Sequence, residues 1–352
     1  MEKKGSISSP GRICLFGEHQ DYLGLPVIPM AINRRLKLHY QLNENSTHVT
    51  FCSNQVDHIE TMSYNQKPNK FESIYSYLMA VFSYFWDHMD QKMISKLMID
   101  SDIPIRAGLS SSAALLVAST FLFNNILTQE HILEEIAEIA YFCEHEILGV
   151  SCGRMDQYAS SLGGIFHMTS HKNPNIVHLR LNREAFFVIG DSRVERKADI
   201  PLKTVQDDIF EALRIMSTPN LLELNLRDIK AKRLSKKHEK RLIGVIGVRD
   251  NTLKAFDEFK KNKRDLEYIG SLITEQQNLL KDNYEVSHPK LDKMCQISEI
   301  NGALGAKLTG AGFGGCMFAL CADKDTALRI KNSLQKFGTS FITKIDSGVR
   351  ED

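Results

Sequence analysis

Hydrophobic and polar positions mix strand and helix periods up to about residue 200. Residues 35–42 (RLKLHYQL) alternate apolar and polar side chains, which is typical of a half-buried strand. Residues 71–89 form an aromatic run without glycine or proline, which predicts a buried helix. Two more helices are expected from Ser110 to about Leu127 and from Glu130 to Leu148. Short strands are expected at 96–103, 165–167, 176–181 and 186–189.

Helical periods dominate from residue 202 to 301, interrupted by the basic stretch 230–241. The last fifty residues predict a glycine loop, a strand at 316–321, a helix at 323–337 and a strand at 341–345. The strands cluster instead of alternating regularly with helices, so we expect an α+β fold and not a doubly wound sheet. We place a boundary near residue 185, with an N-terminal lobe of residues 1–185 and a C-terminal lobe of 186–352.

The composition, 43% hydrophobic and 25% charged, is that of a folded globular chain. Because 44 basic side chains balance 43 acidic ones, no overall field favours nucleic acid or an anionic membrane as a partner. The basic stretch is interpreted as a solvent-exposed helix face or loop. The start lacks the pattern of a secretory signal, no apolar run could cross a bilayer, and the seven cysteines form no Cys-x-x-Cys pair. We therefore expect a reduced, soluble, cytoplasmic protein.

The segment 105–119 (IRAGLSSSAALLVAS) places Gly108 and three serines, Ser110, Ser111 and Ser112, before an apolar helix. The N-terminus of a helix offers unpaired N–H groups to a phosphate, and small residues let the phosphate approach the backbone. Serine hydroxyls can also ligate Mg²⁺. Ordinary helix capping explains the same pattern. The segment lacks the Gly-Lys-Ser/Thr ending of a P-loop.

A second segment, 9–24 (SPGRICLFGEHQDYLG), gathers Arg12, Glu18, His19 and Asp21 between turn-forming glycines. Such a group of polar side chains can bind the vicinal hydroxyls of a polyol, since carboxylates accept strong hydrogen bonds. Alternatively, the residues form a surface loop in which an exposed Arg–Glu pair contributes little to stability.

Two carboxylates, Glu144 and Asp156, flank a glycine turn at 149–153 that can bring them to one site. One carboxylate that holds Mg²⁺ and another that takes a hydroxyl proton are what phosphoryl transfer requires. By spacing alone, Asp156 also fits an ordinary position near the start of a helix. A glycine-rich segment, 308–320 (LTGAGFGGCMFAL), supplies backbone that can lie against a ligand or another loop.

These four segments, in this order, resemble the GHMP kinases, and GRICLFGEHQDYLG is similar to the galactokinase signature. The resemblance implies a two-lobed fold with the active site in the cleft between the lobes, ATP and Mg²⁺ as cofactors, and direct phosphoryl transfer to a sugar, at its anomeric hydroxyl. It assigns the ATP phosphates to Gly108 and Ser110 to Ser112, Mg²⁺ to Ser112 and Glu144, and catalysis to Asp156 as base with Arg12 beside it. The remaining assigned residues, Glu18, His19 and Asp21, would bind the sugar.

The sequence departs from the galactokinase pattern in places that leave the sugar open. Gln20 stands where galactokinases have threonine, Leu23 to Leu25 replace Asn-Gly-Gly, and residues 192–208 lack the tyrosine that contacts the sugar. Galacturonate, arabinose or an amino sugar are alternatives to galactose. Mevalonate is another, although Asp21 followed by Tyr22 argues against so small an alcohol. A sensor that binds sugar and ATP without turnover is the alternative outside the enzymes.

Overall fold

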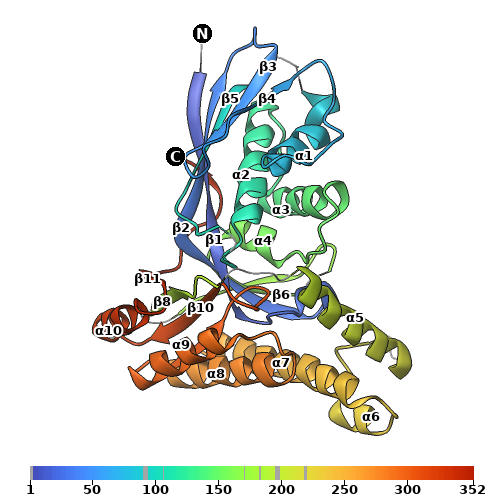
Figure 1. Ribbon diagram of the computed structural model, residues 1–352, viewed down its shortest axis with the longest axis vertical. Coiled ribbons are helices and arrows are strands. Elements are labelled where there is room, and N and C mark those ends of the chain that lie inside the picture. Colours follow the sequence, from blue (N-terminus) through green and yellow to red (C-terminus); the bar gives the residue numbers. More distant parts are fainter. Residues whose placement is uncertain are drawn as a thin grey trace.

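The computed structural model describes residues 3–89, 94–105, 107–169, 171–181, 184–194, 199–217 and 220–352. Within them lie two sheets, each with helices packed on it (Figure 1). The first sheet has the order β12-β1-β2-β5-β3-β4, with β6 on β2 and β7 on β6. Its strands are β1 (Lys3–Phe16), β2 (Pro26–Leu42), β3 (His48–Ser53), β4 (Glu60–Ser63), β5 (Ile94–Ser101), β6 (Ile165–Thr169), β7 (Ile176–Leu179) and β12 (Arg350–Glu351).

Helices α1 (Ser76–Phe85), α2 (Ser111–Ile126), α3 (Leu133–Phe142) and α4 (Met155–Leu162) lie on one side of this sheet (Figure 1). Most of α2 is apolar and buried, because it lies between the sheet and the other helices. Phe123 of α2 packs edge-on against Phe82 at 4.8 Å and stacks on Phe85 of α1 at 5.2 Å between ring centroids. This aromatic contact fixes α2, and with it the serine segment at its start.

The second sheet is antiparallel throughout, in the order β11-β8-β10-β9. Its strands are β8 (Phe186–Asp191), β9 (Gly305–Leu308), β10 (Cys316–Cys321) and β11 (Thr339–Thr343). The helices of this half are α5 (Asp199–Met216), α6 (Leu226–Lys230), α7 (Lys236–Lys260), α8 (Leu266–Asp282), α9 (Pro289–Ile300) and α10 (Lys324–Leu334). Helices α8 and α9 both pack directly on β9, and this packing fixes the position of that strand.

The chain returns to the first sheet after β11. Ile345 bridges Ile32, and β12 pairs with β1. Arg35 of β2 donates to the carbonyls of Ser347 and Gly348 and lies 2.9 Å from the Asp346 carboxylate. We propose that the lobes divide near residue 185, with this returning segment lying on the first lobe.

The α+β prediction is confirmed, and the strand expected at 316–321 coincides with β10. The helix expected from Glu130 to Leu148 is shorter. It begins at Leu133, ends at Phe142 and continues as a π-helical turn, Cys143–Ile147. The long strand β1 was not predicted, because serines, a proline and a glycine hide its apolar residues in the sequence, yet it is buried from Ile7 onward.

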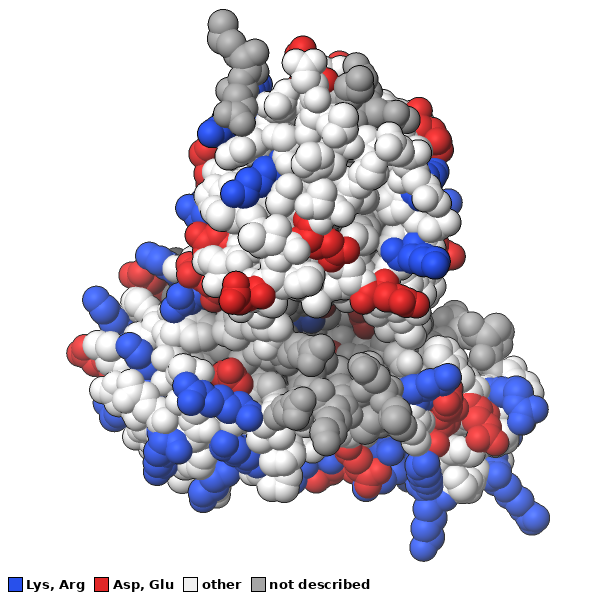
Figure 2. Space-filling view, turned by 45° about the horizontal axis from the view of Figure 1, so that its top comes forward, with Lys and Arg blue, Asp and Glu red and all other residues white. Residues whose placement is uncertain are grey.

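Basic side chains of the stretch 230–241 form ion pairs with nearby carboxylates. Lys237 lies 2.8 Å from Asp208, and Arg241 lies 2.9 Å from Glu285. On the face in Figure 2, basic and acidic side chains are interspersed. Among the described residues, no helix combines the length and the apolar character needed to span a bilayer.

Candidate active site

A cavity of about 900 Å³ collects every residue that the sequence singled out for the site. Its walls come from both halves of the chain: β1 and the loop after it, the start of α2, the start of α4, α5 and the glycine-rich loop after β9. The predicted residues on its lining are Arg12, Glu18, His19, Asp21, Gly108, Ser110, Ser111, Ser112, Glu144 and Asp156. The surface-loop alternative for Glu18 and Arg12 is wrong, because both side chains are almost fully buried.

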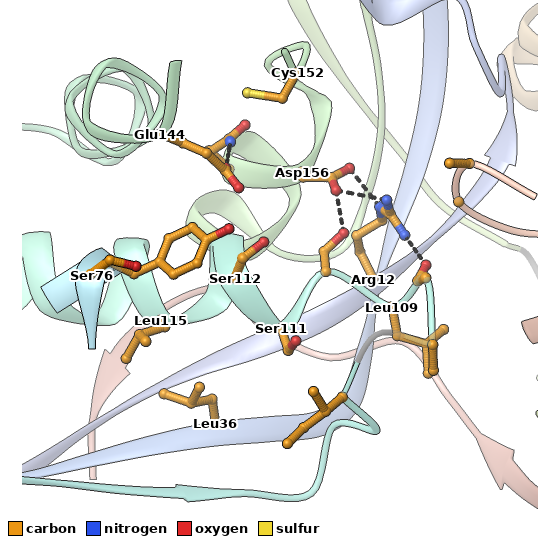
Figure 3. A pocket seen from close by; sticks show the side chains of 18 of the residues that line it. Arg12, Leu36, Ser76, Leu109, Ser111, Ser112, Leu115, Glu144, Cys152 and Asp156 are labelled. Carbon is orange, nitrogen blue, oxygen red and sulfur yellow. Dashed lines mark hydrogen bonds and ion pairs between the residues drawn. The ribbon is translucent and has the colours of Figure 1, made fainter. Parts of the chain in front are cut away.

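Arg12 of β1 fixes Asp156, which lies in the first turn of α4 (Figure 3). Its Nε donates to Oδ1 and its Nη2 to Oδ2, each at 2.7 Å. The remaining nitrogen, Nη1, donates to the Gly108 carbonyl at 2.6 Å. Such a two-point pair sets the orientation of the carboxylate as well as its charge. One guanidinium therefore joins the carboxylate to the loop that precedes α2.

Ser110 holds Asp156 from the other side. Its hydroxyl donates to Asp156 Oδ2, and its side chain makes no hydrogen bond that caps α2. Its backbone is left-handed, with φ 61°, a conformation that costs a residue other than glycine about 1–2 kcal/mol. Such strain is concentrated at functional sites, where the surrounding structure holds it. Helix capping therefore does not explain this serine.

Glu144 lies on the π-helical turn, which the sequence did not predict. Turns of this kind are frequent at functional sites. Its carboxylate is buried and accepts a hydrogen bond from Gln157 Nε2 at 2.5 Å. Burial, then the negative charge of Asp156, raises the pKa of Glu144 to about 7, and hydrogen bonds from Gln157 and Ser112 offset part of this. Ser112 lies below Glu144 on the same wall (Figure 3).

Asp21 faces the same site from the loop after β1, at the start of a short 3₁₀ turn, Asp21–Leu23. A Cβ at Gly153 would lie 2.0 Å from Asp21 Oδ2, so only glycine lets this carboxylate sit where it does. Burial, then the charge of Asp156, raises the pKa of Asp21 to about 7. The 149–153 turn lies between Glu144 and Asp156, and both of these carboxylates line the cavity.

Glu18 is held by a residue that the sequence did not reveal. Its Oε2 accepts from Lys307 Nζ at 2.7 Å and its Oε1 from the Gly310 N–H at 2.5 Å. His19 has a left-handed backbone, φ 63°, and its Nδ1 lies 3.4 Å from the Tyr22 hydroxyl. Lys307 belongs to β9, and no linear motif marks a contact between residues so far apart in the chain.

The two glycine loops touch each other beside the site. A Cβ at Gly310 would lie 2.9 Å from both the Cα and the carbonyl oxygen of Gly108. The Cys316 N–H donates to the Ala107 carbonyl at 2.9 Å. The segment before α2 is therefore braced by the second half of the chain, as the glycine-rich segment predicted.

Gln20, which stands where galactokinases have threonine, does not contribute to the cavity wall. Its side chain is fully buried and donates to the Tyr284 hydroxyl at 2.7 Å and to the Val245 carbonyl at 3.4 Å. In the segment 192–208, which lacks the tyrosine of the galactokinase pattern, Leu202 and Gln206 of α5 line the cavity. Residues 195–198 of that segment lie outside the described residues.

The far end of the cavity carries several aliphatic side chains. Leu36, Ile99 and Leu115 line it together with the side chains before and at the start of α1. Figure 3 shows Leu36 and Leu115 below Ser111 and Ser112, on the side away from Asp156. The serine segment thus lies between the carboxylates of Glu144 and Asp156 and these two leucines.

Comparison with known proteins agrees with this geometry. Residues 2–39 match the galactokinase galactose-binding signature, 76–164 the GHMP kinases N terminal domain and 253–340 the GHMP kinases C terminal domain. The chain is 30% identical over 333 residues to the galactokinase of Thermotoga petrophila, covering 93% of this chain and 92% of that one. It is 30% identical over 346 residues to the galactokinase of Thermotoga maritima, covering 96% of each.

Solved structures show the same fold. Lactococcus lactis galactokinase complexed with galactose superposes with a TM-score of 0.88 at 24% identity, over 99% of this chain and 95% of that one. The Methanococcus jannaschii mevalonate kinase gives 0.75 at 22% identity, over 98% and 99%. The predicted two-lobed fold is confirmed. With galactokinases as relatives over nearly its whole length, the chain belongs to the GHMP kinase family, as a galactokinase-like sugar kinase.

Proposed function

We propose that this kinase transfers the γ-phosphoryl group of ATP to the anomeric hydroxyl of galactose, with Mg²⁺ as the assisting ion. The observation that carries the proposal is the Arg12–Asp156 pair, which joins a carboxylate at the sugar end of the cavity to the loop at the start of α2. We propose ATP as the phosphoryl donor. We also propose that the protein is cytoplasmic and has no nucleic-acid partner.

The roles proposed for the residues follow from their positions. Asp156 accepts a hydrogen bond from the sugar hydroxyl and takes its proton as the new P–O bond forms and the bond to ADP breaks. Arg12 orients Asp156 and stabilises charge on the transferring group, while the backbone of Gly108 and the segment from Ser110 to Ser112 receive the phosphates. Catalysis then rests on positioning and charge neutralisation, as in other phosphoryl transfers.

The donor set suits magnesium. Ser112 and Glu144 would hold the ion, since both offer oxygen ligands on the same wall of the cavity. Glu144 is buried and its pKa is raised, so its charged form lacks compensation that a divalent cation would supply. When bound with ATP, Mg²⁺ neutralises phosphate charge.

Glu18, His19 and Asp21 are the proposed sugar-binding residues, because they line the end of the cavity that holds Asp156. Asp21 directs a carboxylate to the cavity, and carboxylates accept strong hydrogen bonds from sugar hydroxyls. The match of residues 2–39 to a galactose-binding signature supports galactose over the other sugars.

The test is ADP release measured with galactose, galacturonate, arabinose, galactosamine and mevalonate. We expect the highest kcat/KM with galactose. Preferred turnover of another sugar would reassign the substrate and keep the kinase. Preferred turnover of mevalonate would overturn the sugar assignment, and binding of sugar and ATP without ADP release would favour the sensor.

A further inference from the structure

We infer that Lys307 is a positioning residue of the sugar site, which acts by holding the Glu18 carboxylate from the second sheet. The inference rests on the proposed role of Glu18 in sugar binding. Lys307 belongs to β9, whereas Glu18 follows β1 and lines the cavity, so the contact joins the two halves of the molecule directly behind a cavity residue.

The Lys307 ammonium lies in a fully buried position. Its side chain is 0% exposed and its Nζ donates to Glu18 Oε2 at 2.7 Å and to the Cys14 carbonyl at 2.9 Å. It also lies 5.3 Å from the ring centroid of Phe318. A buried ammonium is expensive unless it is paired and hydrogen-bonded, and both conditions are met here. The ion pair with Glu18 therefore stabilises the charged Lys307 ammonium in its buried position.

The Glu18 carboxylate is fixed at both oxygens by the second half of the chain. Lys307 holds Oε2, and the Gly310 N–H, from the glycine-rich loop, holds Oε1. A carboxylate has about four acceptor positions, so two such bonds leave capacity for a substrate hydroxyl. Lys307 thus determines which way the remaining acceptor positions face.

The same contact limits the negative charge that gathers at the sugar end. Glu18 and Asp156 both act on Asp21 and favour its protonated form. Without Lys307, the buried Glu18 carboxylate would lose its cationic partner and leave uncompensated charge beside Asp21. This change alters the hydrogen bonds offered to the sugar more directly than those offered to the phosphates.

The decisive experiment compares Glu18→Gln with the Glu18→Gln/Lys307→Met double variant. If Lys307 acts through Glu18, removal of Lys307 no longer matters once the carboxylate is gone. We expect the galactose KM of the two variants to agree within twofold. A further rise of tenfold or more in the double variant would overturn the inference, since Lys307 would then act by another route.

The single variant Lys307→Met is expected to raise the galactose KM at least tenfold and the ATP KM less than twofold. Equal rises in both would contradict a role at the sugar. Should this variant fail to fold, the comparison above still decides, because the double variant removes the two charges together. Lys261→Met is the matched control. Lys261 pairs with the buried Glu258 at 2.5 Å outside the cavity, and its loss should change neither KM.

Failure of the proposed substrate is recognised separately. If wild type does not phosphorylate galactose, the proposed function fails, and the same variants are compared with the sugar that wild type turns over best. Dependence of the Lys307 effect on Glu18 would then still support the positioning role, and independence would overturn it.

Discussion

Arg12 and Asp156 are joined at two points, Nε to Oδ1 and Nη2 to Oδ2, both at 2.7 Å. Asp156 keeps part of its side chain open to the cavity, whereas Arg12 is almost wholly enclosed. The carboxylate is therefore presented to the substrate by a cation that the solvent hardly reaches. This relationship leads directly to the first prediction.

Asp156→Asn is expected to lower kcat by about 10²–10⁴-fold, the usual contribution of a general base. The ATP dissociation constant, measured by calorimetry, should change less than threefold, because the proposed role of Asp156 is at the acceptor hydroxyl. Asp87→Asn, an exposed carboxylate paired with Lys67, serves as control and should keep full activity. Full activity in the Asp156 variant would remove this residue from the mechanism.

Gly153→Ala is expected to reproduce the effect of Asp21→Ala, with a galactose KM raised at least tenfold and an ATP KM nearly unchanged. The reason is steric, since the new Cβ would lie 2.0 Å from Asp21 Oδ2 and displace that carboxylate. Gly149→Ala is the matched control. A Cβ there meets nothing within 4 Å, but φ is 68°, so stability should fall by about 1–2 kcal/mol without a change in KM. An unchanged galactose KM in Gly153→Ala would show that Asp21 is misassigned.

Magnesium activation should strengthen with rising pH. The pKa of Glu144 is raised to about 7, so this carboxyl is mostly protonated at pH 6 and mostly ionised at pH 8. Since a metal ligand must be deprotonated, the Mg²⁺ concentration for half-maximal rate should be roughly tenfold lower at pH 8 than at pH 6.

The reference for this measurement is Glu144→Gln, because ATP itself also titrates in this range. The variant should need more Mg²⁺ and show a clearly smaller ratio between the two pH values. An equal ratio in the two proteins would mean that Glu144 does not hold the ion.

Gln20→Thr is expected to reduce stability and to leave the order of sugar preference unchanged. The substitution leaves the buried Tyr284 hydroxyl without its 2.7 Å donor, which costs about 1–3 kcal/mol. Urea denaturation measures the loss, and Tyr284→Phe added to Gln20→Thr should recover part of it. A changed sugar preference would show that this departure from the galactokinase pattern acts on the substrate after all.

The sequence predicted those features that depend on neighbouring residues. The apolar run at 316–321 indicated β10, and the serines before α2 indicated an anion site, because both patterns are local. The π-helical turn was missed because residues 143–147 continue the helical period of α3, and that period does not distinguish the two forms. Resemblance to a family supplied the roles of Arg12 and Asp156, which spacing alone left open.

Two long-range contacts at the site were not predicted. Glu18 and Lys307 are 289 positions apart, and nothing near either residue in the sequence indicates the other. The same holds for Asp21 and Gly153, whose contact depends on how two loops meet. Gln20 shows the converse, since a substitution inside the motif proves to face the protein interior.

The strand β12 has a consequence for synthesis on the ribosome. Residues 346–352 reach β1 and Arg35 only after the whole second sheet has been translated. While the second sheet is being translated, the first sheet therefore lacks one edge strand and the partners of Arg35. Pairing of β12 with β1 must therefore follow translation of the second sheet, and a chain cut short before residue 346 would lack this edge strand and the partners of Arg35.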